Sequence, residues 1–159
     1  MVVGNAYTIL KRLVDVTAPY LGDDFLTTSV AVVGQLFKAD MVFVTRLLDH
    51  PPTRVRVLAA WQDGGLRDSF EFDLVGTPCE MVFDGAPVVI PGDVCRNFAA
   101  EKETTFESYV GIPLWGPSGE MIGHYAIISS QRIATPAEGE VLREIAQICA
   151  HRFEAEAWR

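Results

Sequence analysis

The side chains best suited to chemistry in this sequence are its cysteines and histidines. They are Cys79, Cys95, Cys149, His50, His124 and His151. The cysteines are odd in number and widely spaced, without the Cys-x-x-Cys motif of a zinc ribbon or a thioredoxin-like site. No two histidines have metal-ligand spacing. The sequence therefore predicts no metal site, and unpaired thiols fit a reducing compartment such as the cytoplasm.

Cys79 has the most suggestive surroundings. In the segment Thr77-Pro78-Cys79-Glu80, threonine at the N-cap, proline at the first helical position and glutamate at the third indicate a capping box. Free N–H groups and the helix dipole there favour a thiolate, so one interpretation is a redox sensor or a covalent attachment point. The alternative, which we favour, is a small buried apolar residue.

Other reaction chemistry has little support. His124 lies in an expected strand, where a haem-ligating histidine and a hydrogen-bonded core histidine are the two interpretations, and we favour the second. No pair of carboxylates has a recognisable acid–base setting. The glycines of Asp63-Gly64-Gly65 are typical of a turn and not of a phosphate loop. We therefore expect a protein that is not an enzyme.

Composition excludes several partner classes. The 159-residue chain carries a formal net charge of −8, which disfavours nucleic acid and anionic membranes as partners. Its apolar stretches are too short to span a bilayer, and residues 1–4 lack the start of a signal peptide. We expect one cytoplasmic domain.

The order of elements indicates an α+β fold. The expected elements are a first helix ending before Pro19, a helix from Asp23 to Lys38, strands 40–48, 54–61 and 70–74, a short helix after Thr77, a strand at 88–91, a short helix capped by Asp93, strands 108–114 and 121–129, and a long helix from the capping box at 135–138 to near Trp158. The strand 54–61 alternates, with Val55, Val57, Ala59 and Trp61 expected on one side. Two hairpins around a crossover predict an antiparallel sheet with helices on one face. The crossover, residues 63–106, is long enough to act as a lid or binding segment.

Three segments resemble the GAF domain family. They are 72–80, at the start of that family's pocket helix, 107–114, its penultimate strand, and 119–124, the glycine hairpin before its last strand. The resemblance covers about residues 23–153. It implies a PAS-related central antiparallel sheet, with N- and C-terminal helices on one face and a pocket-forming crossover on the other. Residues 1–159 would then form one domain, with an N-terminal helix in 1–22 and a C-terminal signalling helix in 135–159.

The same resemblance implies a sensory and regulatory module. Such domains bind small molecules and act beside a kinase, cyclase or transcription regulator, as in two-component systems. The ligand stays open, because the motifs of bilin-binding and cyclic-nucleotide GAF domains are not evident here. Glu101, Lys102 and Glu103 are interpreted as a solvated charged loop. The candidate pocket residues are Trp61, Phe72, Thr77, Cys79, Phe98, Tyr109 and His124.

The last helix suggests a second role. Its apolar stripe is wider than one sheet face requires, so we expect a homodimer through the terminal helices. The candidate contacts are Ile145, Ile148 and Phe153, with further apolar surface at Ala157 and Trp158. The chain ends without a helix stop signal, which favours a piece of a larger signalling protein over a stand-alone chain.

Two other functions remain as alternatives. One is a redox enzyme of the free methionine sulfoxide reductase kind, which also has a GAF fold. In those enzymes the attacking cysteine lies shortly before the penultimate strand, and residues 99–106 contain none. The other is a dimerisation module with a filled core and no ligand.

Overall fold

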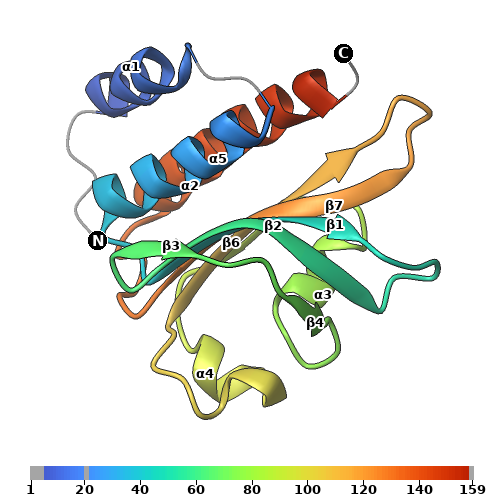
Figure 1. Ribbon diagram of the computed structural model, residues 1–159. Coiled ribbons are helices and arrows are strands. Elements are labelled where there is room, and N and C mark those ends of the chain that lie inside the picture. Colours follow the sequence, from blue (N-terminus) through green and yellow to red (C-terminus); the bar gives the residue numbers. More distant parts are fainter. Residues whose placement is uncertain (1–5, 20–21, 158–159) are drawn as a thin grey trace.

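A computed structural model describes residues 6–19 and 22–157 of the chain (Figure 1). The elements are α1 (Ala6–Thr17), α2 (Gly22–Phe37), β1 (Met41–Leu47), β2 (Arg54–Gln62), β3 (Gly65–Arg67), β4 (Glu71–Asp73), α3 (Cys79–Val82), β5 (Val88–Ile90), α4 (Val94–Asn97), the 3₁₀ helix η1 (Ala99–Glu101), β6 (Ser108–Trp115), β7 (Met121–Ser129) and α5 (Pro136–Ala157). The expected elements are present in the expected order, with β3 and η1 in addition, and α2 begins at Gly22, so Asp23 lies within its first turn.

The strands form one antiparallel sheet of seven strands. Its order is β3-β2-β1-β7-β6-β5, and β4 pairs with the other end of β2. The two hairpins, β1–β2 and β6–β7, are joined by the pairing of β1 with β7, in register from Met41↔Ile128 to Val44↔Tyr125. The predicted α+β class and antiparallel sheet are therefore confirmed.

The two terminal helical segments cover one face of this sheet (Figure 1). The helix α2 packs on β1 and β2, α5 packs on β6 and β7, and α1 lies against α2. The core on this face includes Val30 and Val33 of α2 and Leu142 of α5, all fully buried. Apolar residues at helical spacing thus bury one stripe against the sheet, as predicted.

The crossover covers the opposite face, where Figure 1 shows α3, α4 and β4 beneath the sheet. A second core lies there, built on Phe43, Tyr109 and Ala126 of the sheet and closed by Val82 of α3 and Val94. The domain therefore has two apolar layers, one on each side of β1, β7 and β6.

A β-bulge in β2 overturns the expected alternation of that strand. Val44 pairs with Ala59 and Thr45 pairs with Val57, so Leu58 is an extra residue. A bulge of one residue transfers every later side chain to the other face. Val57 accordingly packs in the crossover-side core, whereas Ala59 packs in the helix-side core.

Trp61 follows Ala59 to the helix side. A Cβ built on Gly34 of α2 would lie 2.1 Å from Cδ1 of the Trp61 indole. The indole therefore occupies the space that a larger residue at position 34 would need.

The two sequence motifs expected to be capping boxes differ in the structure. At the start of α5, the Glu138 N–H donates to Thr135 Oγ1 at 3.2 Å, and the Glu138 carboxylate accepts the Ala134 N–H at 3.0 Å. Thr77 instead donates its hydroxyl to the Leu74 carbonyl at 2.7 Å. Among the described residues no side chain caps α3, so the prediction there was wrong.

Asp93 precedes α4 as expected but does not cap it through its side chain. Its backbone is left-handed, with φ of 66°, and its carbonyl accepts the N–H groups of Arg96 and Asn97. Its carboxylate pairs with Arg132 at 3.1 Å. This ion pair ties the crossover to the segment before α5.

Candidate functional site

A cavity of about 370 Å³ lies between the sheet and the crossover. Its walls come from β1, β2, β3, β4, β7, the start of α3 and the segment around η1. Ligand pockets are commonly concave and apolar, with a few convergent polar groups. The lining residues are Met41, Phe43, Gln62, Arg67, Phe70, Phe72, Asp73, Thr77, Cys79, Ala100, Glu101, Thr104, Phe106 and Ile128.

Aromatic rings form much of the wall. Phe43 and Phe72 meet edge to face, with centroids 5.8 Å apart and planes at 89°. Phe70 lies 6.1 Å from Phe72, and the Arg67 guanidinium carbon is 3.9 Å from the Phe70 centroid. An aromatic wall of this kind binds flat apolar groups and, through its ring faces, cations.

Most polar groups of the cavity already have protein partners. Arg67 donates to the side-chain oxygen of Gln62, and the Thr104 hydroxyl donates to the Glu101 carbonyl at 2.7 Å. The Glu101 carboxylate differs, because it has no hydrogen-bond or ion-pair partner within the described ranges 6–19 and 22–157. Burial raises the pKa of this half-buried carboxyl group.

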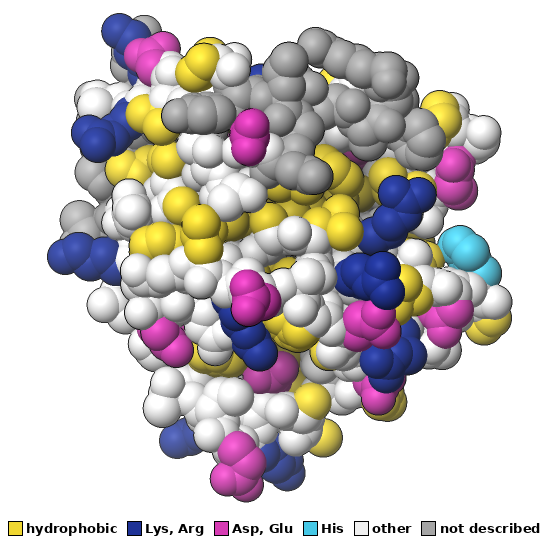
Figure 2. Space-filling view, in the orientation of Figure 1, with side chains coloured by type: hydrophobic (Ala, Val, Ile, Leu, Met, Phe, Trp, Pro, Cys, Tyr) yellow, Lys and Arg dark blue, Asp and Glu magenta, His cyan; other side chains and the backbone are white. Residues whose placement is uncertain are grey.

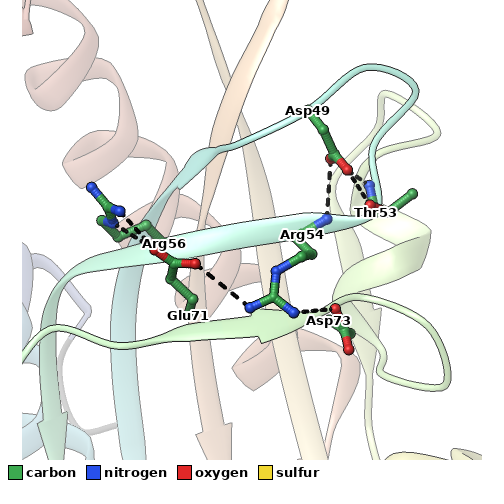
Figure 3. Close-up of polar contacts among 6 residues, drawn as sticks. All are labelled: Asp49, Thr53, Arg54, Arg56, Glu71 and Asp73. Carbon is green, nitrogen blue, oxygen red and sulfur yellow. Dashed lines mark hydrogen bonds and ion pairs between the residues drawn. The ribbon is translucent and has the colours of Figure 1, made fainter.

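An ionic ladder beside the cavity holds β4 to β2, and one of its members, Asp73, also lines the cavity (Figure 3). Arg54 pairs with Asp73 at 2.6 Å, and Arg56 pairs with Glu71 at 2.6 Å. Figure 2 shows basic and acidic side chains next to each other at the right of this face, where Figure 1 places β2 and β4. Phe72 lies between the two acids of β4, so the ladder positions this ring at the cavity.

The turn before β2 is held by another acid, Asp49. The Asp49 carboxylate accepts the backbone N–H groups of Thr53 at 2.8 Å and of Arg54 at 3.1 Å, and also the Thr53 hydroxyl (Figure 3). The Thr53 hydroxyl lowers the pKa of Asp49, so this carboxylate stays ionised and keeps the turn closed. The turn sets the start of β2, on which β4 is paired.

Phe72, Thr77 and Cys79 are the candidate pocket residues that line the cavity. Trp61 lies on the opposite face of the sheet, and its placement in the pocket is corrected here. The cause is the bulge at Leu58, which strand alternation alone does not reveal.

Phe98, Tyr109 and His124 lie on the crossover side without lining the cavity. Phe98 packs against the crossover-side core, and Tyr109 is fully buried within it. The Tyr109 hydroxyl has no hydrogen-bond partner in the part of the chain that the structure describes. These three residues pack behind the side chains that line the cavity.

Cys79 is 2% exposed, and burial raises the pKa of its thiol to about 12. This overturns the interpretation of an activated thiolate and supports the apolar one. Cys95 is partly buried and donates to the Glu107 carboxylate at 3.5 Å. Burial also raises the pKa of Cys95, and it raises the pKa of Cys149 to about 12.

His124 is a hydrogen-bonded core histidine. Its Nδ1 lies 2.6 Å from Thr45 Oγ1, and its ring meets Phe43 and Phe83 with centroids 5.5 and 5.2 Å away. Burial lowers its pKa to about 3, so the ring is neutral. Of the two sequence interpretations, the structure agrees with the core histidine.

Arg67, Glu101 and Phe43 are cavity residues that sequence reasoning missed. Glu101 was assigned to a solvated loop because it stands beside Lys102 and Glu103, which are indeed exposed. Phe43 sits in a strand buried on both faces, where no alternation marks the side it faces.

The apolar stripe of α5 is largely used within the domain. Ile145 is fully buried in the helix-side core, so its assignment to a dimer contact is corrected. Ile148 remains 39% exposed, and Phe153 is partly buried against the core. Trp158 lies outside the described residues.

No group of three or more His, Cys, Asp or Glu side chains that could hold a metal ion occurs among the residues described. Over the same residues, no helix is both long and apolar enough to cross a membrane.

The GAF domain family model matches residues 8–153. The chain belongs to the GAF domain family. The match begins within α1, earlier than the sequence resemblance. No curated protein matches the chain at a significant level.

Solved structures share the GAF fold at low identity. A putative GAF sensor protein from Burkholderia vietnamiensis has a TM-score of 0.73 at 14% identity, covering 97% of this chain and 96% of that one. Free methionine-R-sulfoxide reductase from Neisseria meningitidis, in complex with its substrate, has a TM-score of 0.72 at 19% identity, covering 99% and 95%. The phycocyanobilin-bound GAF domain of a cyanobacterial phytochrome has 0.67 at 18%, covering 99% and 98%. These likenesses concern the fold.

Proposed function

We propose that this GAF domain is a non-enzymatic sensory module that binds a small molecule in the cavity between the sheet and the crossover. The observation that carries the proposal is the cavity of about 370 Å³, with aromatic walls and a few polar groups. Two structural neighbours hold small molecules, a bilin in one and a substrate in the other. A role in the cytoplasm, beside a fused kinase, cyclase or transcription regulator, is part of the proposal.

The central strands offer a route from the cavity to the helices. Phe43 of β1 and Ile128 of β7 line the cavity, whereas their neighbours Val42 and Ile127 pack in the helix-side core. A ligand that binds one packing arrangement better than another shifts the population of α2 and α5 on the same strands. The signal then passes through a homodimer of terminal helices, where Val16 and Ile148 are 38% and 39% exposed.

Ligand binding is tested by native mass spectrometry of the purified chain, with an absorbance scan for pigments. We expect a co-purified small molecule, or stabilisation by members of a metabolite panel. Ala100→Trp places a large ring beside the cavity and abolishes both effects, whereas Ala137→Trp on exposed α5 leaves them intact. A chain without bound mass and without stabilisation contradicts the proposal and favours the ligand-free dimerisation module.

The dimer is tested by analytical ultracentrifugation. We expect Ile148→Lys to weaken self-association, because it places a charge in the exposed apolar part of α5. Leu66→Lys, at a residue 57% exposed on β3, serves as the control. A chain that stays monomeric at high concentration removes the dimer from the proposal.

A reductase is the second candidate, because Cys79 lines the cavity and a sulfoxide reductase is among the structural neighbours. The raised pKa values of Cys79 and Cys95 weigh against it, since the thiolate is the attacking form. Turnover of free methionine sulfoxide, lost in Cys79→Ser or Cys95→Ser, would replace the sensory proposal with this one.

A further inference from the structure

The Glu101 carboxylate is the charged group of the cavity that lacks a protein partner in residues 6–19 and 22–157. The other lining charges are already engaged: Asp73 pairs with Arg54 at 2.6 Å, and Arg67 donates to Gln62 and lies over Phe70. Glu101 holds its neighbours only through its backbone, whose carbonyl accepts from the N–H and the hydroxyl of Thr104. Its carboxylate is free to bind a guest.

The Glu101 carboxylate lies near the buried end of the cavity wall. Burial is the main cause that raises the pKa of Cys79, which lines the cavity, and of Tyr109, which is buried behind it, and the charge of Glu101 adds to both shifts. The pKa of Glu101 is raised by burial, and none of the described cations acts to lower it. The Glu101 charge is thus partly desolvated and has no counter-ion. A cationic group bound in the cavity would compensate this charge.

The aromatic wall of the cavity also favours a positively charged ligand. The faces of phenylalanine rings attract cations, and Arg67 already uses the face of Phe70 in this way. Phe43, Phe72 and Phe106 present further rings to the cavity. A carboxylate beside several aromatic rings is a recognition site for an ammonium group with an apolar body.

The balance of charge disfavours an anion. The Asp73 charge is compensated by Arg54, and the Arg67 guanidinium already lies over Phe70, so Glu101 is the lining charge that is left for a guest. The whole chain carries −8, which attracts cations over a longer range.

We propose that the cavity binds an organic cation, an amine or quaternary ammonium compound with an aromatic or apolar body, whose charged nitrogen pairs with the Glu101 carboxylate. This inference rests on the proposed ligand-binding function and names the chemical class of the ligand.

Three probes of nearly equal size and different charge test the inference: 2-phenylethylamine, the neutral 2-phenylethanol and the anion 3-phenylpropanoate. Each is titrated into the full chain by calorimetry at neutral pH, with ¹H–¹⁵N spectra to locate binding. We expect the amine to bind roughly tenfold more tightly than the alcohol, as an ion pair with a partly desolvated carboxylate supplies. The anion binds most weakly.

Glu101→Gln keeps the shape of the side chain and removes its charge. We expect it to abolish the preference for the amine while the alcohol still binds as before, which also shows that the cavity is intact. Glu103→Gln, at an exposed carboxylate two residues away, retains the preference.

The possible outcomes separate the two proposals. If the alcohol or the anion binds as tightly as the amine, or if Glu101→Gln leaves the preference unchanged, the cation proposal is overturned and the ligand-binding function stands. If none of the three probes binds, the cation proposal is overturned, whereas the ligand-binding function is decided by the mass spectrometry and the metabolite panel.

Discussion

Thr45 and His124, which are 79 positions apart in the sequence, are joined by hydrogen bonds in the buried interior. Thr45 Oγ1 lies 2.6 Å from His124 Nδ1 and accepts the His124 backbone N–H at 3.1 Å. The contact lies directly beyond the last paired residues of β1 and β7, Val44 and Tyr125. A Cβ on neighbouring Gly123 would lie 2.0 Å from the Thr45 carbonyl oxygen, so the strands approach closely here. Thr45 therefore continues the join between the two hairpins where the backbone ladder stops.

Replacing Thr45 by valine should weaken this join. Thr45→Val keeps the side-chain shape but leaves buried polar groups of His124 unsatisfied, which costs about 1–3 kcal/mol of unfolding free energy. Urea denaturation measures the loss, and Thr45→Ser, which keeps the hydroxyl, should lose less. A Thr45→Val variant as stable as wild type, with a loss seen only in Thr45→Ser, would show that the methyl group and not the hydrogen bonds matters.

His124 makes the stability of the domain depend on pH. Its pKa in the folded state is lowered from the ordinary value of 6.5 to about 3, so below pH 6.5 the unfolded chain binds a proton that the folded chain does not. Its contribution is full above pH 6.5 and is lost as pH falls toward 3, at up to about 1.4 kcal/mol per pH unit.

The matched variants for this effect are His124→Gln and His50→Gln, the second at an exposed position. Urea denaturation at several pH values should show a shallower acid loss for His124→Gln and an unchanged loss for His50→Gln. An identical slope in wild type and His124→Gln would rule out His124 as the source.

Gly34 and Trp61 offer a test of the corrected strand assignment. Gly34→Ala forces its methyl group against the indole, and overpacking of this kind costs about 1–3 kcal/mol. The same change at Gly65 meets no atom within 4 Å and should be mild. In a Trp61→Leu background the cost of Gly34→Ala should shrink, as a thermodynamic cycle of urea midpoints would measure. Additive costs would mean that the two residues do not touch.

The cysteines should differ in reactivity toward iodoacetamide. Cys79 and Cys149 are buried with pKa values raised to about 12, so the native protein protects both from alkylation at neutral pH. Cys95, which is partly exposed, should be modified first, as peptide mass mapping of a time course would show. Rapid modification of native Cys79 would revive its interpretation as a redox sensor.

Glu101 should make a small, pH-dependent contribution without ligand. Burial raises its pKa in the folded state, so the folded chain favours the protonated form and loses stability as pH rises through that pKa. Glu101→Gln should therefore stabilise the ligand-free domain at neutral pH, by less than about 1 kcal/mol because solvent screens this half-buried group. The gain should vanish in acid and be absent in Glu103→Gln. Thermal melts at both pH values measure it.

The sequence predicted the order of elements because strands and helices here bury one face each, and burial leaves a period in the residues. The capping prediction was correct at Thr135, whose side chain caps the exposed start of α5 by accepting the Glu138 N–H. It failed at Thr77, whose hydroxyl prefers the carbonyl of Leu74 in a tight turn. A local sequence pattern shows which side chains can form hydrogen bonds, but the fold determines which partner each of them meets.

The cavity was predicted in part for the same reason. Phe72, Thr77 and Cys79 lie in the segment that resembles the GAF pocket helix, and all three line the cavity. Trp61 was misplaced because an extra residue in β2 leaves no mark in the alternation. Glu101 was missed because its lack of a counter-ion is a property of its surroundings in space.

The extra residue at Leu58 also exchanges the two faces of β2 part-way along the strand. Val55 and Val57 pack in the core on the cavity side, whereas Ala59 and Trp61 face the layer that carries α2. Because Gln62 at the end of the same strand lines the cavity, the stretch after the bulge contacts the helix layer with one face and the guest site with the other. We therefore expect related domains to vary least along this stretch, where a single substitution would disturb both.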